Sequence, residues 1–291
     1  MSSNYYWIIA IVSMISFTLI NVLSKISFNK NGEMLSYKSF LPVYLAFSAI
    51  VVVIIAFIMV GNVYLPVYAT GYAALMGGMY CFAAYIAFFS LENEKVGSIT
   101  IIEDSQFVIL SFLSAVLFVQ SLIVKDALPS VLTLAGVVLI TLNGKGFRKL
   151  SRFALFAFGA AVTWVIMWLV FFSTDPVGVS PLVYYAWVAV FTAAVSVPFT
   201  FMIGMKKEEF HRFKSRSLLS YVFLAALFNG LGTILFSLAY KLNAVYSPII
   251  VQISVPLVII ISFIVFKEKL SIKQLTGAAA IVASVFILIF L

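Results

Sequence analysis

The C-terminal stretch, residues 240–291, reads YKLNAVYSPIIVQISVPLVIIISFIVFKEKLSIKQLTGAAAIVASVFILIFL. It contains two apolar segments, residues 244–266 and 271–291, which are joined by the charged residues Lys267, Glu268 and Lys269. At about 1.5 Å per residue, a helix of either length crosses a hydrocarbon core of roughly 30 Å. The stretch therefore predicts a helical hairpin through a membrane, and the first half of the chain carries a weaker copy of it.

The composition of the whole chain is typical of a membrane protein. Of its 291 residues, 64% are hydrophobic and 10% are charged, against about 25% charged residues in soluble domains. The net charge of +8 comes from basic residues in short gaps between apolar runs, which indicates orientation in a lipid bilayer and not nucleic-acid binding. A single cysteine, Cys81, and a single histidine, His211, exclude a disulfide framework within the chain and a multi-cysteine metal site. We therefore predict no metal site and no cofactor.

Apolar runs of about twenty residues without strict alternation favour helices over the strands of a membrane barrel. They predict ten spans: residues 5–26, 37–60, 67–91, 98–124, 127–142, 153–172, 181–205, 218–240, 244–266 and 271–291. The fifth is short enough to lie partly outside the hydrocarbon core. No basic residue precedes the first run, so we interpret it as a retained span and not as a cleaved signal peptide.

The distribution of basic residues predicts the orientation of these spans. All but two of the 18 Lys and Arg residues follow odd-numbered spans, and the exceptions are Lys125 and Lys241. Loops rich in Lys and Arg stay in the cytoplasm. We therefore expect a multi-pass protein of the plasma membrane with both termini outside.

An internal repeat emerges when the chain is shifted by about 147 residues. Residues 89–91 then meet residues 236–238, Tyr37 meets Tyr184, and Phe17 meets Trp164. A shift of about 141 sets Gly136 against Gly277. Five spans per half is an odd number, so the second half must enter the membrane upside down. The predicted fold is an all-α integral membrane domain of two inverted five-helix repeats, residues 1–146 and 147–291.

Two groups of residues carry a resemblance to a known family. The first group lies along the last two spans and comprises Pro256, Glu268, Ser271, Gln274 and Gly277. The second lies in the first span and comprises Phe17, Asn21 and Lys25. Together they resemble the ten-helix drug/metabolite transporter superfamily of the EamA type, although Lys267 stands where the family has glycine and Phe17 where it usually has tryptophan. The commonest orientation in that family puts both termini in the cytoplasm, opposite to the charge rule here.

The resemblance implies a secondary active or facilitative transporter that works by alternating access. Its site would lie at the midplane between the two halves, with the first turns of spans four and nine beside a central cavity. A small-molecule substrate and the lipid bilayer are then the expected partners, and the protein is expected as a monomer or weak homodimer.

Adjacent carboxylates, Glu103 and Asp104, lie in the fourth span. A carboxylate at the bilayer centre costs about 2.5 to 3.5 kcal/mol on the translocon scale. Either the helix begins only at Phe107, which leaves Glu103 at the interface, or Glu103 lines a wet cavity. Neighbouring helical residues point about 100° apart, so we expect only one of the pair, Glu103, to face that cavity. Burial favours the protonated form of a carboxylate, which makes Glu103 the candidate proton carrier.

Lys25 is the candidate partner of Glu103, since both lie in the predicted cytoplasmic half of the membrane. The alternative is a lysine that snorkels from a helix end.

Further candidates for substrate binding are aromatic or uncharged polar residues at membrane depth. The aromatic candidates for the site are Tyr80, Trp164 and Trp168, with Tyr85, Tyr184, Tyr185 and Trp187 as further cavity candidates. Their alternative is packing against lipid or at the interface, above all for Tyr184 and Tyr185. The polar candidates are Asn21, Gln106, Asn229 and Gln252, for which interhelical hydrogen bonding is an equal alternative. Pro248 and Pro256 could interrupt the ninth span.

Aromatic rings beside a carboxylate suit an ammonium group, so an amino acid or a related ammonium-bearing compound is the first substrate hypothesis. Export of amphiphilic cationic drugs or quaternary amines is the second. Anionic sugar phosphates fit less well because few basic residues lie at membrane depth. A non-transport lipid-handling protein is the alternative class. An enzyme is not predicted, because neither a paired base and nucleophile nor a phosphate loop is found.

Overall fold

The computed structural model describes residues 5–29, 35–119, 124–141, 152–173, 179–205, 215–268 and 271–290. The first half contains α1 (Tyr6–Asn29), α2 (Tyr37–Val60), α3 (Val67–Asn93), α4 (Val96–Ser114), the π-helical turn η2 (Ala115–Val119) and α5 (Val124–Thr141). The second half contains α6 (Arg152–Ser173), α7 (Pro181–Met202), α8 (Arg216–Leu242), α9 (Tyr246–Val251), α10 (Ser254–Phe266) and α11 (Ile272–Phe290). The described chain is thus helical almost throughout.

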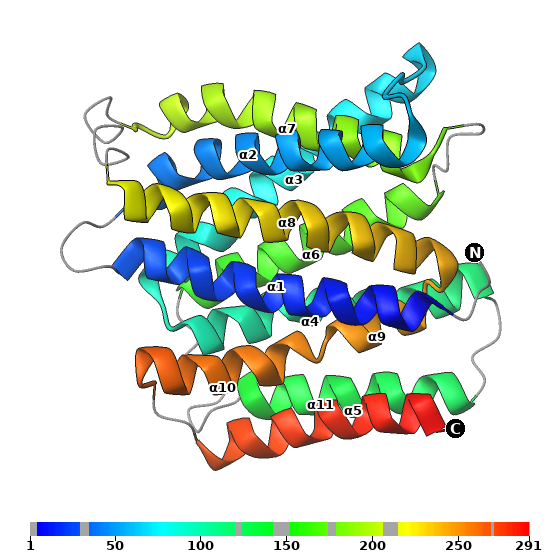
Figure 1. The fold of residues 1–291 in the computed structure, drawn as a ribbon. Helices are drawn as coiled ribbons and strands as arrows, with labels where there is room; N and C mark the ends of the chain where they lie inside the picture. The colour runs from blue at the N-terminus through cyan, green and yellow to red at the C-terminus, as the bar shows by residue number, and fades with distance from the viewer. Residues whose placement is uncertain are drawn as a thin grey trace.

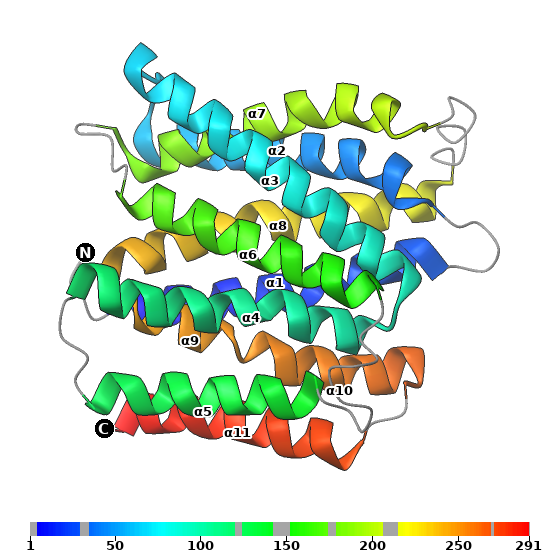
Figure 2. The ribbon, with the colours of Figure 1, turned by 180° about the vertical axis from the view of Figure 1, so that it is seen from behind.

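The helices of the two halves interleave in one bundle (Figures 1 and 2). The closest packing is between α1 and α8, α2 and α7, α3 and both α6 and α7, α4 and α6, and α5 and α11. The pair α5 and α11 forms one edge of the bundle, and α2 with α7 forms the opposite edge (Figure 1). Both termini lie at the same end, as five spans per half would require.

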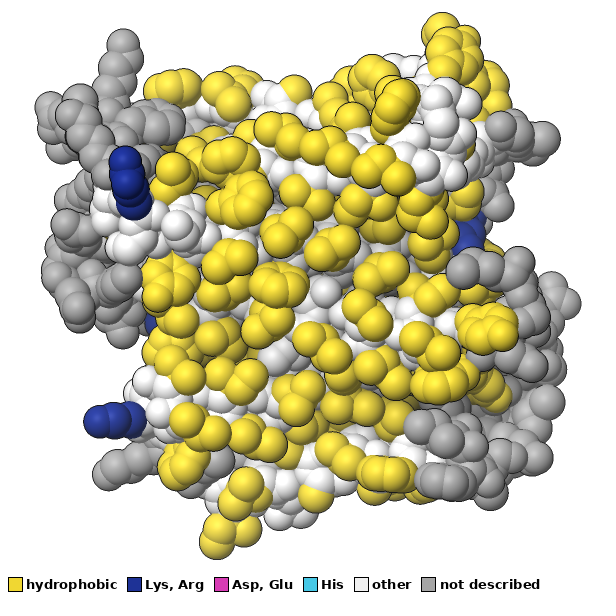
Figure 3. Space-filling model, viewed as in Figure 1, with side chains coloured by type: hydrophobic (Ala, Val, Ile, Leu, Met, Phe, Trp, Pro, Cys, Tyr) yellow, Lys and Arg dark blue, Asp and Glu magenta, His cyan; other side chains and the backbone are white. Residues whose placement is uncertain are grey.

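Eight helical segments of the described residues are long and apolar enough to cross a membrane. The broken pair α9 and α10 counts as one of these, Tyr246–Phe266, while α11 has a shorter apolar part, Ile272–Ile287. Figure 3 shows hydrophobic side chains over the middle of the face drawn there, with Lys and Arg only toward its two ends. The chain is therefore a multi-pass membrane protein, and the ten-span count and the inverted repeat stay predictions.

Part of the charge argument falls on residues outside the described ranges. These residues are Lys30, Lys145, Arg148, Lys149, Lys206, Lys207, His211, Arg212, Lys214 and Lys269. The predicted orientation therefore rests on the sequence.

Two predicted spans are interrupted in the structure. The fourth was expected as one helix over residues 98–124, but the α-helix ends at Ser114 and continues as the wider turn η2. The ninth, residues 244–266, stops at Val251 and restarts at Ser254. Pro256 has no N–H to donate to the carbonyl four residues earlier, which explains why the break falls here, as the prolines of this span predicted.

Three residues of the C-terminal part of the family resemblance form hydrogen bonds at the starts of helices. Ser271 and Gln274 form a capping box at the start of α11, with Ser271 N donating to Gln274 Oε1 at 2.8 Å and Gln274 N to Ser271 Oγ at 3.2 Å. Glu268 accepts hydrogen bonds from the first amides of α4, Val96 N at 3.1 Å and Gly97 N at 3.4 Å. These three side chains serve the architecture and lie away from the cavity described below.

Two positions in the last two spans favour glycine for different reasons, Lys267 through its backbone conformation and Gly277 through close helix packing. Lys267 ends α10 with φ of 53°, in the left-handed region that glycine adopts without strain. At Gly136, a Cβ atom would lie 2.7 Å from the Gly277 carbonyl oxygen, so α5 and α11 touch backbone to backbone. Gly136 and Gly277, which the predicted repeat relates, thus form a contact between the first and second halves of the chain.

Candidate functional site

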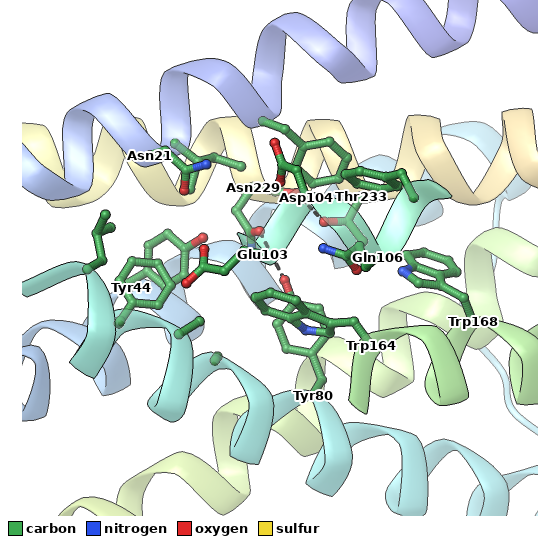
Figure 4. A pocket seen from close by; sticks show the side chains of 17 residues that line it. Asn21, Tyr44, Tyr80, Glu103, Asp104, Gln106, Trp164, Trp168, Asn229 and Thr233 are labelled. Atoms are coloured by element: carbon green, nitrogen blue, oxygen red, sulfur yellow. Dashed lines mark hydrogen bonds between the residues drawn. The ribbon is translucent and has the colours of Figure 1, made fainter. Parts of the chain in front are cut away.

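A cavity of about 70 Å³ lies between α1, α2, α3, α4, α6 and α8. A single water needs roughly 10–15 Å³, so the cavity has room for several waters or a small polar group. Its polar and large aromatic lining residues are Phe17, Asn21, Tyr44, Tyr80, Phe88, Glu103, Asp104, Gln106, Phe107, Trp164, Trp168, Asn229 and Thr233. Of the nine residues predicted to bind substrate, seven line this cavity (Figure 4).

Glu103 lies in the middle of α4 and is 5% exposed. Since α4 begins at Val96, the alternative in which the helix starts at Phe107 and leaves Glu103 at the interface is wrong. The Glu103 carboxylate points into the cavity between Tyr44 and Trp164 (Figure 4). Its Oε1 is buried and has no hydrogen-bond partner among the described residues. A buried carboxylate oxygen left in this state is unfavourable unless a ligand or water completes it.

Asp104 also contributes to the cavity lining, so the expectation that only one of the two carboxylates reaches it is wrong. The two side chains still leave α4 in different directions (Figure 4). Asp104 Oδ2 accepts a hydrogen bond from Ser254 Oγ at 2.6 Å, at the first residue of α10. Asp104 is therefore satisfied by the start of a broken helix, whereas Glu103 retains a free acceptor.

Tyr80 and Asn229 form a hydrogen-bonded wall of the cavity. The Tyr80 hydroxyl donates to Asn229 Oδ1 at 3.0 Å, and Asn229 Nδ2 donates to Ser48 Oγ at 2.8 Å. A smaller cavity on the other side of this wall shares Tyr80, Asn229 and Thr233 with the first. Both readings of Asn229, interhelical bonding and cavity lining, therefore apply at once.

Trp164 and Trp168 share one face of α6, as their spacing of four predicts. Trp164 Nε1 is buried without a partner among the described residues. Trp168 is packed from several sides, stacked on Tyr185 at a centroid distance of 6.0 Å and edge-on to Phe236 at 4.7 Å. Trp164 thus lines the cavity with a ring whose buried N–H is unpartnered among the described residues, and Trp168 forms a fixed wall.

Aromatic clusters flank the cavity along the bundle. Phe28, Phe40, Tyr44 and Phe88 pack together near the C-terminal end of α1 and the N-terminal end of α2. Trp168, Phe171, Phe236 and Tyr240 pack together toward the opposite end. The latter cluster is tied by polar contacts as well, because Tyr240 shares a hydrogen bond of 2.7 Å with Ser114 and Lys241 Nζ lies 4.9 Å from the Phe171 ring centroid.

Two of the nine predicted site residues do not line the cavity. Lys25, expected to pair with Glu103, instead donates to the backbone carbonyls of Leu91 at 2.7 Å, Glu92 at 3.3 Å and Glu94 at 2.8 Å. It stabilises the C-terminal end of α3, where a positive charge complements the helix dipole. Gln252 lies at the break between α9 and α10, fully buried, with no partner for either side-chain atom among the described residues.

Among the further aromatic cavity candidates, Tyr185 lines the smaller cavity. Tyr85, Tyr184 and Trp187 line neither of the two cavities. Tyr85 does not line the cavity, since its hydroxyl bonds to Ser196 O at 3.0 Å and to Thr200 Oγ1 on α7. Tyr184 and Tyr185 are 1% and 3% exposed, so the interfacial interpretation of both is wrong. The sequence analysis also missed Tyr44, although Tyr37, Phe40 and Tyr44 form an aromatic stripe at spacings of three and four along α2.

Comparisons with known proteins agree with this geometry. No curated protein matches the chain. The sequence profile of the EamA-like transporter family matches residues 151–290. Among 28 matching chains of solved structures, one described as "Crystal structure of protein" has a TM-score of 0.67 at 13% identity, over 98% of this chain and 96% of its own. Residues 151–290 thus match the EamA-like transporter family, and the fold of the whole chain is shared with a solved structure.

Proposed function

We propose that this chain carries a small ammonium-bearing metabolite, an amino acid or a related amine, across the membrane. The observation behind the proposal is Glu103, which lines a cavity walled by Tyr44, Tyr80 and Trp164 and has a buried carboxylate oxygen without a partner among the described residues. A family of small-molecule transporters supplies the general activity, and the chemistry of the lining supplies the substrate class.

An ammonium group would gain two kinds of interaction in this cavity. The first is charge attraction and hydrogen bonding to Glu103, which is strong where water is largely excluded. The second is attraction to the faces of the surrounding rings, worth about 0.5 to 2 kcal/mol per contact. Both interactions depend on positive charge, which explains why a neutral or anionic solute would fit less well.

Alternating access is supported by the way the helices pack. Exchanging α1 with α6, α2 with α7, α3 with α8, α4 with the α9–α10 pair and α5 with α11 turns each major contact of the bundle into another one. The repeat also relates Phe17 to Trp164 and Asn21 to Trp168, all of which line the cavity. Residues 1–146 and 147–291 are therefore proposed as inverted halves that exchange conformations about the cavity.

Glu103 is also the proposed site of proton coupling. A carboxylate that binds either a proton or an ammonium group, but not both, would couple the movement of the two. The change Glu103→Gln removes this exchange with little change in shape. If the variant still moved substrate against its gradient in response to a pH difference, coupling through Glu103 would be refuted.

Amphiphilic cations are the second candidate substrate. The aromatic clusters that flank the cavity, with Tyr44 and Phe88 on one side and Trp168 on the other, offer apolar surface for a larger hydrophobic cation. The enclosure of the cavity by six helices favours either solute over a lipid-handling role.

Ligand-dependent thermal stabilisation tests the proposal directly. Purified protein in detergent is heated with amino acids, amines, sugars and organic acids, and a ligand that binds the folded state raises the unfolding temperature. Compounds that stabilise the protein are then tested for uptake into liposomes containing it, with empty liposomes as the control. The proposal predicts that ammonium compounds alone are active in both assays, and activity confined to anions or sugars would contradict it.

A further inference from the structure

We propose that the cavity selects ammonium compounds that lack a free carboxylate, so that amines and amino-acid amides bind more tightly than the corresponding amino acids. This inference rests on the proposed function and narrows its substrate class. It follows from the hydrogen-bond partners of the charged side chains in and around the cavity.

The lining of the cavity contains carboxylates and no fixed positive charge. Glu103 and Asp104 both contribute to it, and none of the described residues that line it is Lys, Arg or His. A substrate carboxylate would therefore enter beside two acidic side chains without a cation to pair with. Placing like charges together in a site of this kind is strongly unfavourable.

The lysine of α1 that lies nearest the cavity lining, Lys25, donates hydrogen bonds to backbone carbonyls. Lys25 lies one helical turn beyond Asn21, but its ammonium group contacts three carbonyls at the end of α3. Turning it into the cavity would leave those carbonyls without their donor, so Lys25 is not available to a substrate.

Helix N-termini could also bind a carboxylate, because their free amides carry partial positive charge. Two helix starts belong to α4 or contact it, and an acidic side chain of the protein accepts a hydrogen bond at each. The start of α4 is capped by Glu268. The start of α10, at the helix break, is next to Asp104, which accepts from Ser254. The Ser254 hydroxyl is thus paired with Asp104, and the next amide, Val255 N, donates to Gln252 O at 3.1 Å, so neither is free for a substrate carboxylate.

The donors that remain in the cavity are neutral. Trp164 Nε1 has no partner among the described residues, and the amides of Asn21 and Gln106 also line the space. Neutral donors of this kind suit a neutral acceptor, such as an amide or ester carbonyl or a hydroxyl. A substrate with an ammonium group for Glu103 and a neutral carbonyl for Trp164 would satisfy both orphaned atoms.

Matched ligand series test this inference. L-phenylalanine, L-phenylalaninamide and phenethylamine share one ring and one ammonium group, and leucine, leucinamide and isopentylamine repeat the comparison with a smaller side chain. Dissociation constants are measured for the purified protein by isothermal titration at neutral pH. We expect each amide to bind at least about tenfold more tightly than its amino acid, with the plain amine between them.

The outcomes separate this inference from the proposed function. Amino acids that bind as tightly as their amides would overturn the inference and leave ammonium transport intact. If none of the six compounds bound, both proposals would fall.

Conservative variants test the two residues that carry the argument. Trp164→Phe should lower the ratio of the amine dissociation constant to the amide dissociation constant about fivefold, because the indole N–H that favours the amide is lost. Trp187→Phe is the matched control, because Trp187 Nε1 donates to Val63 O outside the cavity. Asp104→Asn should narrow the preference for amide over amino acid by removing one of the two negative charges. An unchanged preference in Asp104→Asn, or an unchanged amide advantage in Trp164→Phe, would contradict the inference.

Discussion

Charged groups are used in opposite ways in two regions of this bundle. At the end of α3 and the start of α4, Lys25 and Glu268 complete the two helix ends with hydrogen bonds to the backbone. In the central cavity, Glu103 and Trp164 keep polar atoms without a partner in the described chain. Both regions contain buried charge, yet only the cavity leaves it unsatisfied. Among these charged groups, the difference lies in hydrogen-bond satisfaction and not in the mere presence of charge at depth.

The largest expected effect tests the cavity side of this comparison. Glu103→Gln keeps the shape of the side chain and removes its charge, so binding of an ammonium ligand should weaken by about 30-fold or more. The unfolding temperature without ligand should not fall, because a buried unpaired charge is removed. Titration calorimetry and thermal unfolding measure the two quantities. Glu94→Gln, which alters a carboxylate outside the cavity lining, serves as the control, and equal losses in both variants would refute the assignment.

Lys25→Met tests the architectural side of the comparison, at the C-terminal end of α3. Methionine keeps an apolar side chain of similar length but cannot donate to the three carbonyls at the end of α3. We expect the free energy of unfolding to fall by about 1.5 to 3 kcal/mol, while the affinity for an ammonium ligand stays unchanged. Denaturant unfolding in detergent and the binding assay measure this pair. A loss of ligand affinity with unchanged stability would show that Lys25 binds the ligand, and it would contradict the difference drawn between the two regions.

Glu268→Ala should have a smaller effect of the same kind. It removes the acceptor for the first two amides of α4, and caps of this type contribute about 0.5 to 2 kcal/mol. Glu268→Gln keeps an acceptor and should recover part of the loss, which identifies hydrogen bonding as the cause. The same unfolding measurement applies, and an alanine variant as stable as the parent would show that the cap is dispensable.

The smallest expected effect is a gain in stability. Lys267→Gly places glycine at a left-handed helix end and relieves a conformation that L-residues adopt at a cost of about 1 kcal/mol. After the greater flexibility of glycine in the unfolded chain is subtracted, we expect a net gain of about 0.5 kcal/mol. A clear loss of stability on unfolding would mean that the lysine side chain contributes contacts that outweigh the strain.

The sequence predicted the helices well because lipid leaves the backbone few alternatives. The second span matches α2 over Tyr37–Val60 residue for residue. Hydropathy could not reveal that α4 turns into η2, because a change in helical winding leaves the apolar pattern intact. The break in the ninth span was predicted only from its prolines, Pro248 and Pro256, and not from hydropathy.

The candidate site was predicted in part. Glu103, Asn21 and the tryptophans follow from polarity and aromatic character at membrane depth, which a sequence displays directly. The hydrogen-bond partners of Lys25 could not be predicted. Several acceptors compete for one ammonium group, and a sequence does not show which backbone carbonyls of another helix lie nearby. Asp104 was misjudged because helical angles describe where a side chain starts and not how wide the cavity beside it is.

The cap that Glu268 places on α4 has a consequence for biosynthesis. A residue near the end of the chain completes the first turn of a helix that begins at Val96, so α4 emerges from the ribosome long before its own cap exists. This helix also has the lowest hydropathy of the eight candidate spans and carries two carboxylates. We therefore expect the first turn of α4 to complete its hydrogen bonds only after the last hairpin has been synthesised.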